Sequence, residues 1–188
     1  MLNDNSKKVQ ENAARALGNL AVNADNKSRI GTHERAIDGL VELLHSGSDQ
    51  AKLPTLNDDT KRCMINFMSV EEKIRFSKAS RESYQLVQDS FKGKSVDLSY
   101  KAINDADLRL FGQCKEINLT QCNKITDAGL AHLTNAMSVN LTCCTKITDA
   151  GLAHLTNATY VNLSECTNIT DAAKQRLIDR GVTVRNAL

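Results

Sequence analysis

The hydrophobic pattern of the C-terminal half repeats with a fixed period. The segment Ile-Thr-Asp-Ala-Gly-Leu-Ala-His-Leu-Thr-Asn-Ala occupies residues 125–136 and recurs at 147–158, and Ile-Thr-Asp-Ala returns at 169–172. The starting positions 125, 147 and 169 are 22 residues apart, and a weaker copy, Ile-Asn-Asp-Ala, lies 22 residues upstream at 103–106. A repeat of this length indicates a stack of similar structural units, each of which covers the next.

Each unit combines a strand-like triplet with a short helical pattern. Apolar, polar and apolar residues alternate in the triplets, as in a strand that is buried on one side. The predicted strands are residues 96–98, 117–119, 139–141, 161–163 and 182–184, and the predicted helices are 105–111, 127–134, 149–156 and 171–179. Thr126, Thr148 and Thr170 are good N-caps, because a threonine hydroxyl can accept a hydrogen bond from a free N–H of the first turn. Stacking would join the strands in one parallel ribbon.

This repeat resembles the cysteine-containing form of the leucine-rich repeat. The family's frame Leu-x-x-Leu-x-Leu-x-x-Cys has Cys114, Ala136 or Ala158 at its first position. Its last position holds Cys122, Cys144 and Cys166. Equivalent residues of stacked units lie about 4.8 Å apart, so we expect these cysteines to form a ladder of buried thiols. A metal site is the weaker interpretation, because no further ligand completes a tetrahedral zinc centre. We expect His132 and His154 on the exposed helix side.

The N-terminal segment, residues 1–50, predicts helices. Apolar residues recur at helical spacing between positions 13 and 21 and between positions 36 and 44. The sequence from Val9 to Ala21, with the stretch 36–44, resembles a single armadillo repeat. A solenoid needs about three repeats to be stable. We therefore expect this piece to pack on the following segment or to be a remnant of a longer array.

The middle segment, residues 51–95, contains no repeat. A capping signal at Ser69, with Glu72 three residues later, predicts the start of a helix. The stretch 56–81 resembles an F-box, although Asn57 stands where the family has proline and its late tryptophan is missing. Its position directly before the repeats strengthens the resemblance. The alternative is a plain helical connector between two repeat segments.

Together these patterns predict a mixed α and α/β chain. N-terminal armadillo-like and F-box-like helical segments, 1–50 and 51–95, precede a leucine-rich-repeat solenoid with a short parallel β-ribbon at 96–188.

Composition narrows the range of functions. Of the 188 residues, 41% are hydrophobic and 24% are charged, which is typical of folded rather than disordered proteins. The net charge of +2 argues against a dedicated nucleic-acid-binding or polybasic membrane surface. No apolar run approaches the roughly 18 residues of a membrane span, and the first twelve residues lack an apolar signal core. We therefore expect a cytoplasmic or nuclear protein whose six cysteines are reduced thiols.

No arrangement of residues typical of a catalytic site, a phosphate loop or a metal site stands out, so we expect no enzymatic activity, no cofactor and no metal. The resemblances imply a protein-binding adaptor, the substrate-recognition subunit of a cullin-type ubiquitin ligase. In such a subunit the F-box binds a Skp-family adaptor and the repeats bind the target protein. Alternatives are a non-enzymatic scaffold unrelated to ubiquitin, and a pathogen or viral mimic of such an adaptor.

Two sets of candidate contact residues follow. The F-box resemblance implies adaptor contacts at Leu56, Met64, Ile65, Met68, Ile74 and Phe76. Strand side chains alternate, so the residues between and beside the buried positions of the triplets face outward. The predicted target contacts are Asn118, Thr120, Asn140, Thr142, Tyr160, Asn162 and Ser164, with Glu116 and Ser138 beside them. The alternative is that the asparagines form a hydrogen-bonded ladder with a purely structural role.

Overall fold

The computed structural model describes residue 62, residues 65–66 and residues 68–185. The chain divides into two compact units, the first ending at Ser90 and the second beginning at Phe91. The described residues form a mixed α/β structure with six α-helices and one five-stranded parallel sheet. The predicted armadillo-like segment lies outside the described residues, as do Leu56 and Met64. Within the described part, no helix combines the length and the apolar character needed to cross a membrane.

Two helices dominate the described part of the first unit. Helix α5 (Val70–Ser77) begins with the predicted capping box, in which the Ser69 backbone N–H donates to Glu72 at 2.6 Å and the Glu72 N–H donates to Ser69 Oγ at 3.2 Å. Helix α6 (Arg81–Ser90) follows after a short turn and packs against α5. Such caps satisfy N–H groups that have no partner within the helix, so they fix where it begins. The core of this unit includes the buried side chains Ile65, Met68, Phe76 and Val87.

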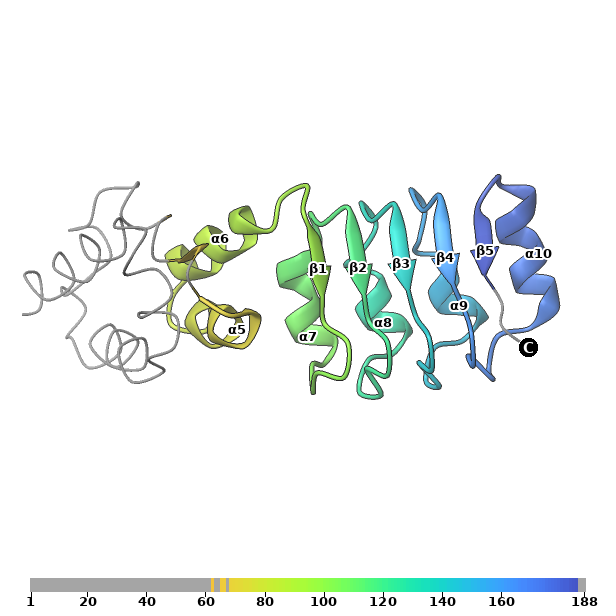
Figure 1. Ribbon diagram of the computed structural model, residues 1–188, viewed down its shortest axis with the longest axis horizontal. Coiled ribbons are helices and arrows are strands. Elements are labelled where there is room, and N and C mark those ends of the chain that lie inside the picture. Colours follow the sequence, from red (N-terminus) through yellow and green to blue (C-terminus); the bar gives the residue numbers. More distant parts are fainter. Residues whose placement is uncertain (1–61, 63–64, 67, 186–188) are drawn as a thin grey trace, which may run out of the picture. The chain divides into compact units, whose positions relative to one another are not determined.

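The second unit is a stack of coils, where one coil is a strand, a turn, a helix and the segment that returns to the next strand. The strands are β1 (Ser95–Asp97), β2 (Glu116–Asn118), β3 (Ser138–Asn140), β4 (Tyr160–Asn162) and β5 (Thr183–Arg185). They lie side by side in chain order, and every neighbouring pair is parallel (Figure 1). The predicted parallel ribbon is therefore confirmed. Individual strand bounds differ from the prediction by one residue, which is the usual uncertainty of strand ends.

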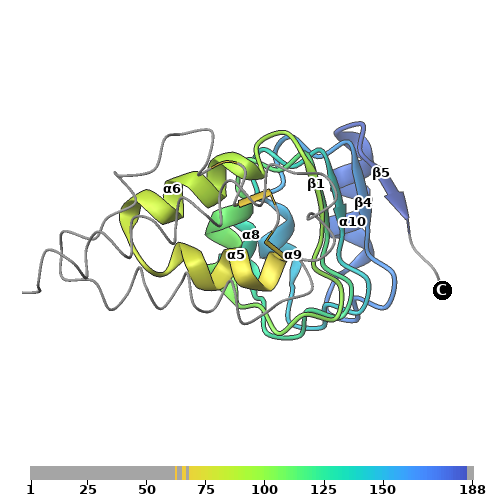
Figure 2. The ribbon, with the colours of Figure 1, turned by 60° about the vertical axis from the view of Figure 1, so that its left-hand side comes forward.

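The helices of the coils lie on one side of this ribbon (Figures 1 and 2). They are α7 (Asp105–Leu108) with the 3₁₀-helix η2 (Arg109–Phe111), α8 (Asp127–Leu130), α9 (Asp149–Leu152) and α10 (Asp171–Asp179). The predictions 127–134 and 149–156 were too long, since α8 and α9 contain only four residues each. The chain continues in tight turns instead: the N–H of Leu133 bonds Leu130 and that of Ala136 bonds Leu133, at 2.9 and 3.0 Å. These i to i−3 bonds bring the chain back to the next strand within 22 residues.

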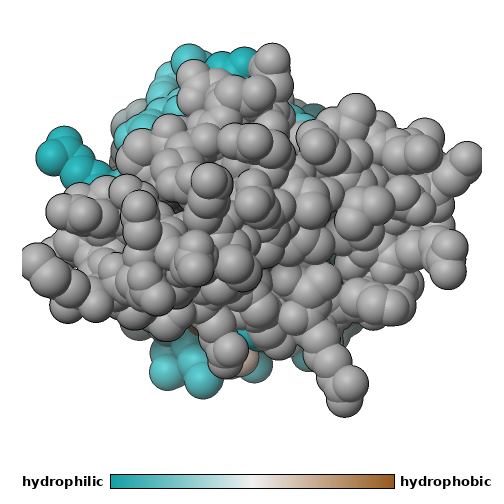
Figure 3. All heavy atoms as spheres, turned by 90° about the vertical axis from the view of Figure 1, so that its left-hand side faces the viewer, coloured by the Kyte–Doolittle hydropathy of each residue, from teal (hydrophilic) through white to brown (hydrophobic). Residues whose placement is uncertain are grey.

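The core of the second unit lies between the ribbon and the helices. It is built from side chains that recur once per coil and are almost fully buried, among them Ile117, Leu119, Leu130, Leu133, Val139, Leu141, Ile147 and Leu155. Large hydrophobic side chains are exposed at only three described positions, Tyr100, Met137 and Ile178. The described residues that are visible in Figure 3 are accordingly coloured mostly as hydrophilic.

The predicted ladder of cysteine thiols is present in this core. Cys122, Cys144 and Cys166 are buried, and each thiol donates to a backbone carbonyl of the preceding coil, that of Leu98, Leu119 and Leu141 respectively, at 3.0 to 3.1 Å. Burial raises the pKa of Cys122 to about 11 and that of Cys144 to about 12. The thiols therefore stay protonated and serve as small hydrogen-bond donors.

A residue with a positive φ angle follows each of the first four strands. These residues are Tyr100, Gln121, Cys143 and Glu165, with φ angles of 62°, 58°, 61° and 60°. The left-handed conformation aims the N–H of Cys143 at the carbonyl oxygen of Ser164 in the next coil, 2.9 Å away. Gln121 makes the same bond to Thr142. The turn thus continues the hydrogen bonding of the ribbon beyond the strands, although none of the four residues is a glycine.

Candidate interaction surfaces

The outer side of the ribbon presents two rows of side chains, which we term the strand face. The first row comes from the first residue of each strand: Ser95, Glu116, Ser138, Tyr160 and Thr183. The second row comes from the third residue: Asp97, Asn118, Asn140, Asn162 and Arg185. Residues within a row are paired in register, so their spacing is that of neighbouring strands, about 4.8 Å.

The asparagines of the second row hold the turns that follow the strands. The Oδ1 atom of Asn140 accepts hydrogen bonds from the backbone N–H of Thr142 at 3.1 Å and from its hydroxyl at 2.6 Å. Asn118 binds Thr120 in the same way, and Asn162 binds Ser164. Side-chain bonds to the backbone two residues ahead are typical of asparagine-led turns. The carbonyl oxygens of these asparagines are therefore occupied within the protein.

Asp97 takes the same position in the first coil. Its carboxylate accepts the backbone N–H of Ser99 at 2.9 Å, and this bond is the main reason why the pKa of Asp97 is lowered. The Ser99 hydroxyl, Lys101 and Asn118 lower the pKa further. Asp97 is exposed, so the carboxylate remains charged at neutral pH and faces solvent.

The seven predicted target-contact residues do share one surface, but several of their hydroxyl groups and amide oxygens already form hydrogen bonds with each other. Asn162 and Ser164 are buried, with exposed fractions of 8% and 7%, and the other five are half-buried. The hydroxyls of Thr120, Thr142 and Ser164 donate to asparagine side chains. In the described part of the chain, no residue accepts a hydrogen bond from Nδ2 of Asn140 or Asn162. The strand face can therefore offer amide N–H donors, together with the ring of Tyr160.

Two charged members of the strand face escaped the sequence analysis. Asp97 and Arg185 are exposed at opposite ends of the asparagine row, in register with Asn118 and Asn162. A signal for both was present, since each occupies the position in its strand that asparagine has in the three inner strands. The predicted strand 182–184 placed Arg185 beyond the ribbon, which hid its relation to the row.

The predicted adaptor contacts lie mainly inside the first unit. Ile65, Met68 and Phe76 are buried, with exposed fractions of 2%, 6% and 1%, whereas Ile74 is half-buried. Ile65, Met68 and Phe76 therefore stabilise this unit, and a partner could reach Ile74 more easily. Val70, Tyr84 and Leu86 are also half-buried apolar or aromatic side chains of α5 and α6, and the sequence analysis did not assign them. Their apolar or aromatic character is visible in the sequence, but it does not separate inner from outer positions of the helices.

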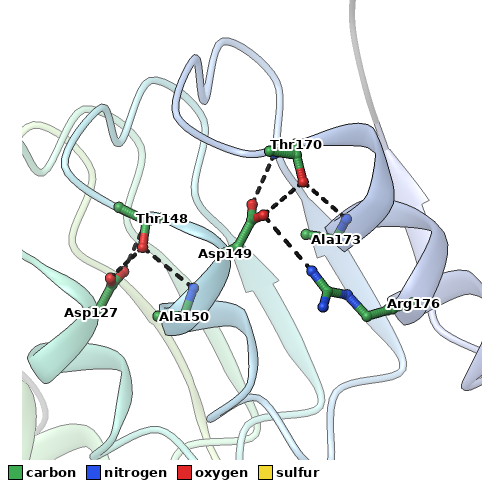
Figure 4. Close-up of polar contacts among 7 residues, drawn as sticks. All are labelled: Asp127, Thr148, Asp149, Ala150, Thr170, Ala173 and Arg176. Carbon is green, nitrogen blue, oxygen red and sulfur yellow. Dashed lines mark hydrogen bonds and ion pairs between the residues drawn. The ribbon is translucent and has the colours of Figure 1, made fainter.

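The helix side of the second unit carries a second polar ladder, which we term the Asp–Thr ladder (Figure 4). Asp127 accepts the backbone N–H of Thr148 at 2.8 Å and its hydroxyl at 2.6 Å. Asp149 binds Thr170 with the same two bonds, at 2.8 and 2.6 Å, and Asp105 binds Thr126 at 2.7 Å in both. Each threonine also caps its own helix. The repeated Thr-Asp pair thus fastens every coil to the next.

The Asp–Thr ladder explains why the repeated motif contains a glycine: the position has no room for a Cβ atom. A Cβ atom added to Gly151 would collide with Oδ1 of Asp127, and one added to Gly129 would collide with Oδ1 of Asp105. The Thr-Asp-Ala-Gly sequence therefore encodes a close contact between coils. In the described part of the chain, no group of histidine, cysteine, aspartate or glutamate side chains is arranged to bind a metal ion.

The two histidines lie on the same helix side. His132 is half-buried, and its Nε2 accepts a hydrogen bond from Nε of Arg109 at 3.3 Å, whereas His154 is exposed. Each lies two residues after the end of α8 or α9, and these helices lie on the side of the ribbon opposite to the strand face (Figure 2). The two surfaces are therefore available for separate tests.

Comparison with known proteins returned no similar sequence. No family model matches the chain, and no curated protein shows significant similarity to it. The function of the two surfaces is therefore inferred from their residues and from the way the fold arranges them.

Proposed function

We propose that this protein is a non-enzymatic, leucine-rich-repeat adaptor that binds a target protein with its strand face and a Skp-family adaptor with its F-box-like first unit. The observation that carries the proposal is the parallel ribbon, to which each coil of 21 to 23 residues contributes one strand. Stacked strand–helix coils with buried cysteines at a fixed position are the architecture that the leucine-rich-repeat resemblance implies. The substrate-recognition role in a cullin-type ubiquitin ligase rests on the additional resemblance of residues 56–81 to an F-box.

The strand face suits protein recognition better than catalysis. Its side chains are amides, hydroxyls, a few charges and Tyr160, and they lie on a parallel sheet in fixed register. Tyrosine brings a large apolar area and a hydroxyl at a low entropic cost, so it is common at the centres of interfaces. In this proposal the chain brings a target close to catalytic partners and performs no chemistry itself.

A plain scaffold without a link to ubiquitin is the second candidate. It is favoured by the burial of Ile65, Met68 and Phe76, because three of the residues expected to contact the adaptor are occupied within the first unit. In this alternative, α5 and α6 connect the repeats to the preceding segment and bind no Skp-family protein. A pathogen or viral mimic of an adaptor would bind a Skp-family protein as well, so it shares the biochemical test of the first proposal.

The decisive experiment is direct binding of the full chain to a purified Skp-family adaptor. We expect Ile74→Asp to weaken this binding more than tenfold, since a charge on a half-buried apolar position has to be desolvated in the interface. Ile178→Asp in α10 is the matched control, because it makes the same change at a position that is 49% exposed in the second unit. Circular dichroism should show both variants folded. Absence of binding by the natural chain would favour the scaffold.

A further inference from the structure

The acidic and the basic side chains of the strand face lie at opposite ends of the ribbon. The acidic side chains Asp97 on β1 and Glu116 on β2 are both exposed. Arg185 on β5 is exposed at the opposite end. Only asparagines stand between Asp97 and Arg185 in the second row. The face therefore has a negative end, an uncharged middle and a positive end.

The fold leaves Glu116 and Arg185 available to a partner, whereas the Asp97 carboxylate is bound by Ser99 and lies near Lys101. Glu116 accepts a hydrogen bond from the Ser95 hydroxyl at 2.7 Å, and Asp97 accepts the Ser99 N–H. Within the described residues, neither Glu116 nor Arg185 forms an ion pair. By contrast, two ion pairs are present on the helix side, Lys174 with Asp171 at 3.0 Å and Arg176 with Asp149 at 3.8 Å.

The middle of the face suits an extended backbone. Asn140 and Asn162 lie in this middle. Asn140 is half-buried, its Nδ2 group has no acceptor among the described residues, and a peptide carbonyl oxygen is a suitable acceptor for it, whereas Asn162 is buried. Tyr160 lies beside them in the first row and offers its ring to an apolar side chain. A nucleic acid is a poor fit, because its phosphates would be repelled by Asp97 and Glu116.

The distance between the charged ends sets the length of the ligand. From β1 to β5 there are four strand spacings, about 19 Å in total at about 4.8 Å each. An extended peptide advances about 3.3 Å per residue, so about six residues cover the row. A basic and an acidic side chain separated by this length could meet both ends at the same time.

We propose that the strand face binds an extended peptide segment that crosses the strands, with a basic side chain against Asp97 and Glu116 and an acidic side chain, about six residues away, against Arg185. This inference rests on the proposed role of the strand face as the target-binding surface, and it adds the chemical class and the orientation of the bound segment. The amides and Tyr160 bind the middle of the peptide and fix the direction of its backbone, and the charges determine which end of the segment is basic and which is acidic.

The test is selection from a phage-displayed library of random nonapeptides on the full natural chain and on a charge-reversed variant. The variant combines Asp97→Lys, Glu116→Lys and Arg185→Glu. The matched control exchanges a pair on the helix side, Asp171→Lys with Lys174→Asp, which keeps the two charges adjacent. We expect the natural chain and the control to select peptides with a basic and an acidic residue about six positions apart.

The charge-reversed variant distinguishes the outcomes. We expect it to select peptides of the opposite polarity, so that the order of the basic and acidic residues along the peptide is exchanged. Selected peptides should lose about two- to fivefold in affinity on Arg185→Ala and should bind more weakly in higher salt. The proposal is overturned if no peptide is enriched, if the peptides have no charge bias, or if the reversed variant selects the same polarity.

The selection does not involve a Skp-family adaptor, so its failure can be told apart from that of the proposed function. Adaptor binding without selection of oriented peptides would support the proposed adaptor role of the first unit and overturn the peptide proposal. Oriented peptides without adaptor binding would establish the strand face as a recognition surface on a plain scaffold.

Discussion

The helices of the inner coils and the helix of the last coil begin differently, although an aspartate of the preceding coil binds the capping threonine in each. In α8 and α9 the residue three positions after the threonine cap is glycine, and the cap accepts from the N–H two residues ahead, that of Ala128 or Ala150 at 3.3 Å. In α10 the corresponding residue is Ala173, and Thr170 accepts from the N–H of Ala173 itself at 3.2 Å. The helix that follows has nine residues instead of four.

The cap backbone shows how the last coil tolerates a Cβ atom. Thr148 has φ and ψ angles of −119° and 178°, whereas Thr170 has −80° and 156°. Both threonines are bound by an aspartate of the preceding coil through the same two hydrogen bonds. The Asp–Thr ladder is therefore compatible with two helix starts, and only the four-residue start requires glycine. The same aspartate–threonine contact therefore requires glycine at one helix start and allows alanine at another.

The largest effect is expected from exchanging the residues that distinguish the two starts. Gly151→Ala should lower the free energy of unfolding by roughly 2–3 kcal/mol, because its Cβ would collide with the Asp127 carboxylate. Ala173→Gly should cost only about 0.5–1 kcal/mol, mainly through helix propensity. Urea unfolding followed by circular dichroism measures both. Equal losses in the two variants would show that the two starts do not differ in their need for glycine.

A smaller effect should follow from removing one aspartate of the ladder. Asp127→Ala leaves the Thr148 N–H and hydroxyl without their acceptor and should cost about 1–2 kcal/mol. Asp171→Ala is the control, since that side chain is 98% exposed and is paired with Lys174 of its own helix. The double variant Asp127→Ala with Gly151→Ala sharpens the test. We expect Gly151→Ala to cost less in this background, because the clashing carboxylate is gone.

The smallest effect concerns acid stability. The Thr170 hydroxyl and N–H, assisted by Arg176, lower the pKa of Asp149 from its ordinary value of 3.8. A carboxylate with a lowered pKa contributes stability above that ordinary value, and the contribution is lost as the pH falls through the folded-state pKa. Asp149→Asn should therefore flatten the loss of stability below about pH 4, as measured by thermal unfolding at several pH values. An unchanged acid limb would show that the carboxylate contributes nothing there.

Much of the second unit could be predicted from the sequence because its signals are local and repeated. The 22-residue period located the three inner strands and the alternation of apolar and polar residues located the two outer ones, all to within one residue. The threonine caps located the starts of α8, α9 and α10. The ends of α8 and α9 could not be predicted, because Leu133 and Leu155 keep helical spacing although the chain has already turned back. The spacing of apolar residues indicates which residues are buried. It does not distinguish a helix from tight turns that bury the same residues.

The surfaces were harder to predict because exposure depends on contacts between coils. The sequence analysis placed Asn162 and Ser164 outward, and their position in the strand and turn is as expected. It could not show that the asparagine oxygen would bind the serine and that both residues would be buried. Likewise, the Thr-Asp pairs did not reveal that the aspartate would bind the threonine of the following coil. The aspartate and the threonine that it binds lie 21 residues apart in the sequence, beyond the reach of local patterns.

The Asp–Thr ladder also bears on how a chain of this kind can change in length. Each inner coil presents an aspartate on one side and accepts an aspartate through its threonine on the other, so a coil is complementary to a copy of itself. The cysteine thiols and the strands repeat in the same way, because each thiol donates to the preceding coil and each inner strand pairs with both neighbours. A duplicated inner coil of 22 residues would find every partner in place. The first and last strand-to-strand steps, of 21 and 23 residues, show that the ribbon also accommodates a difference of one residue at its ends. Tandem duplication is therefore the route of growth that this architecture tolerates best, and the near-identical sequences 125–136 and 147–158 are what such an event would leave behind.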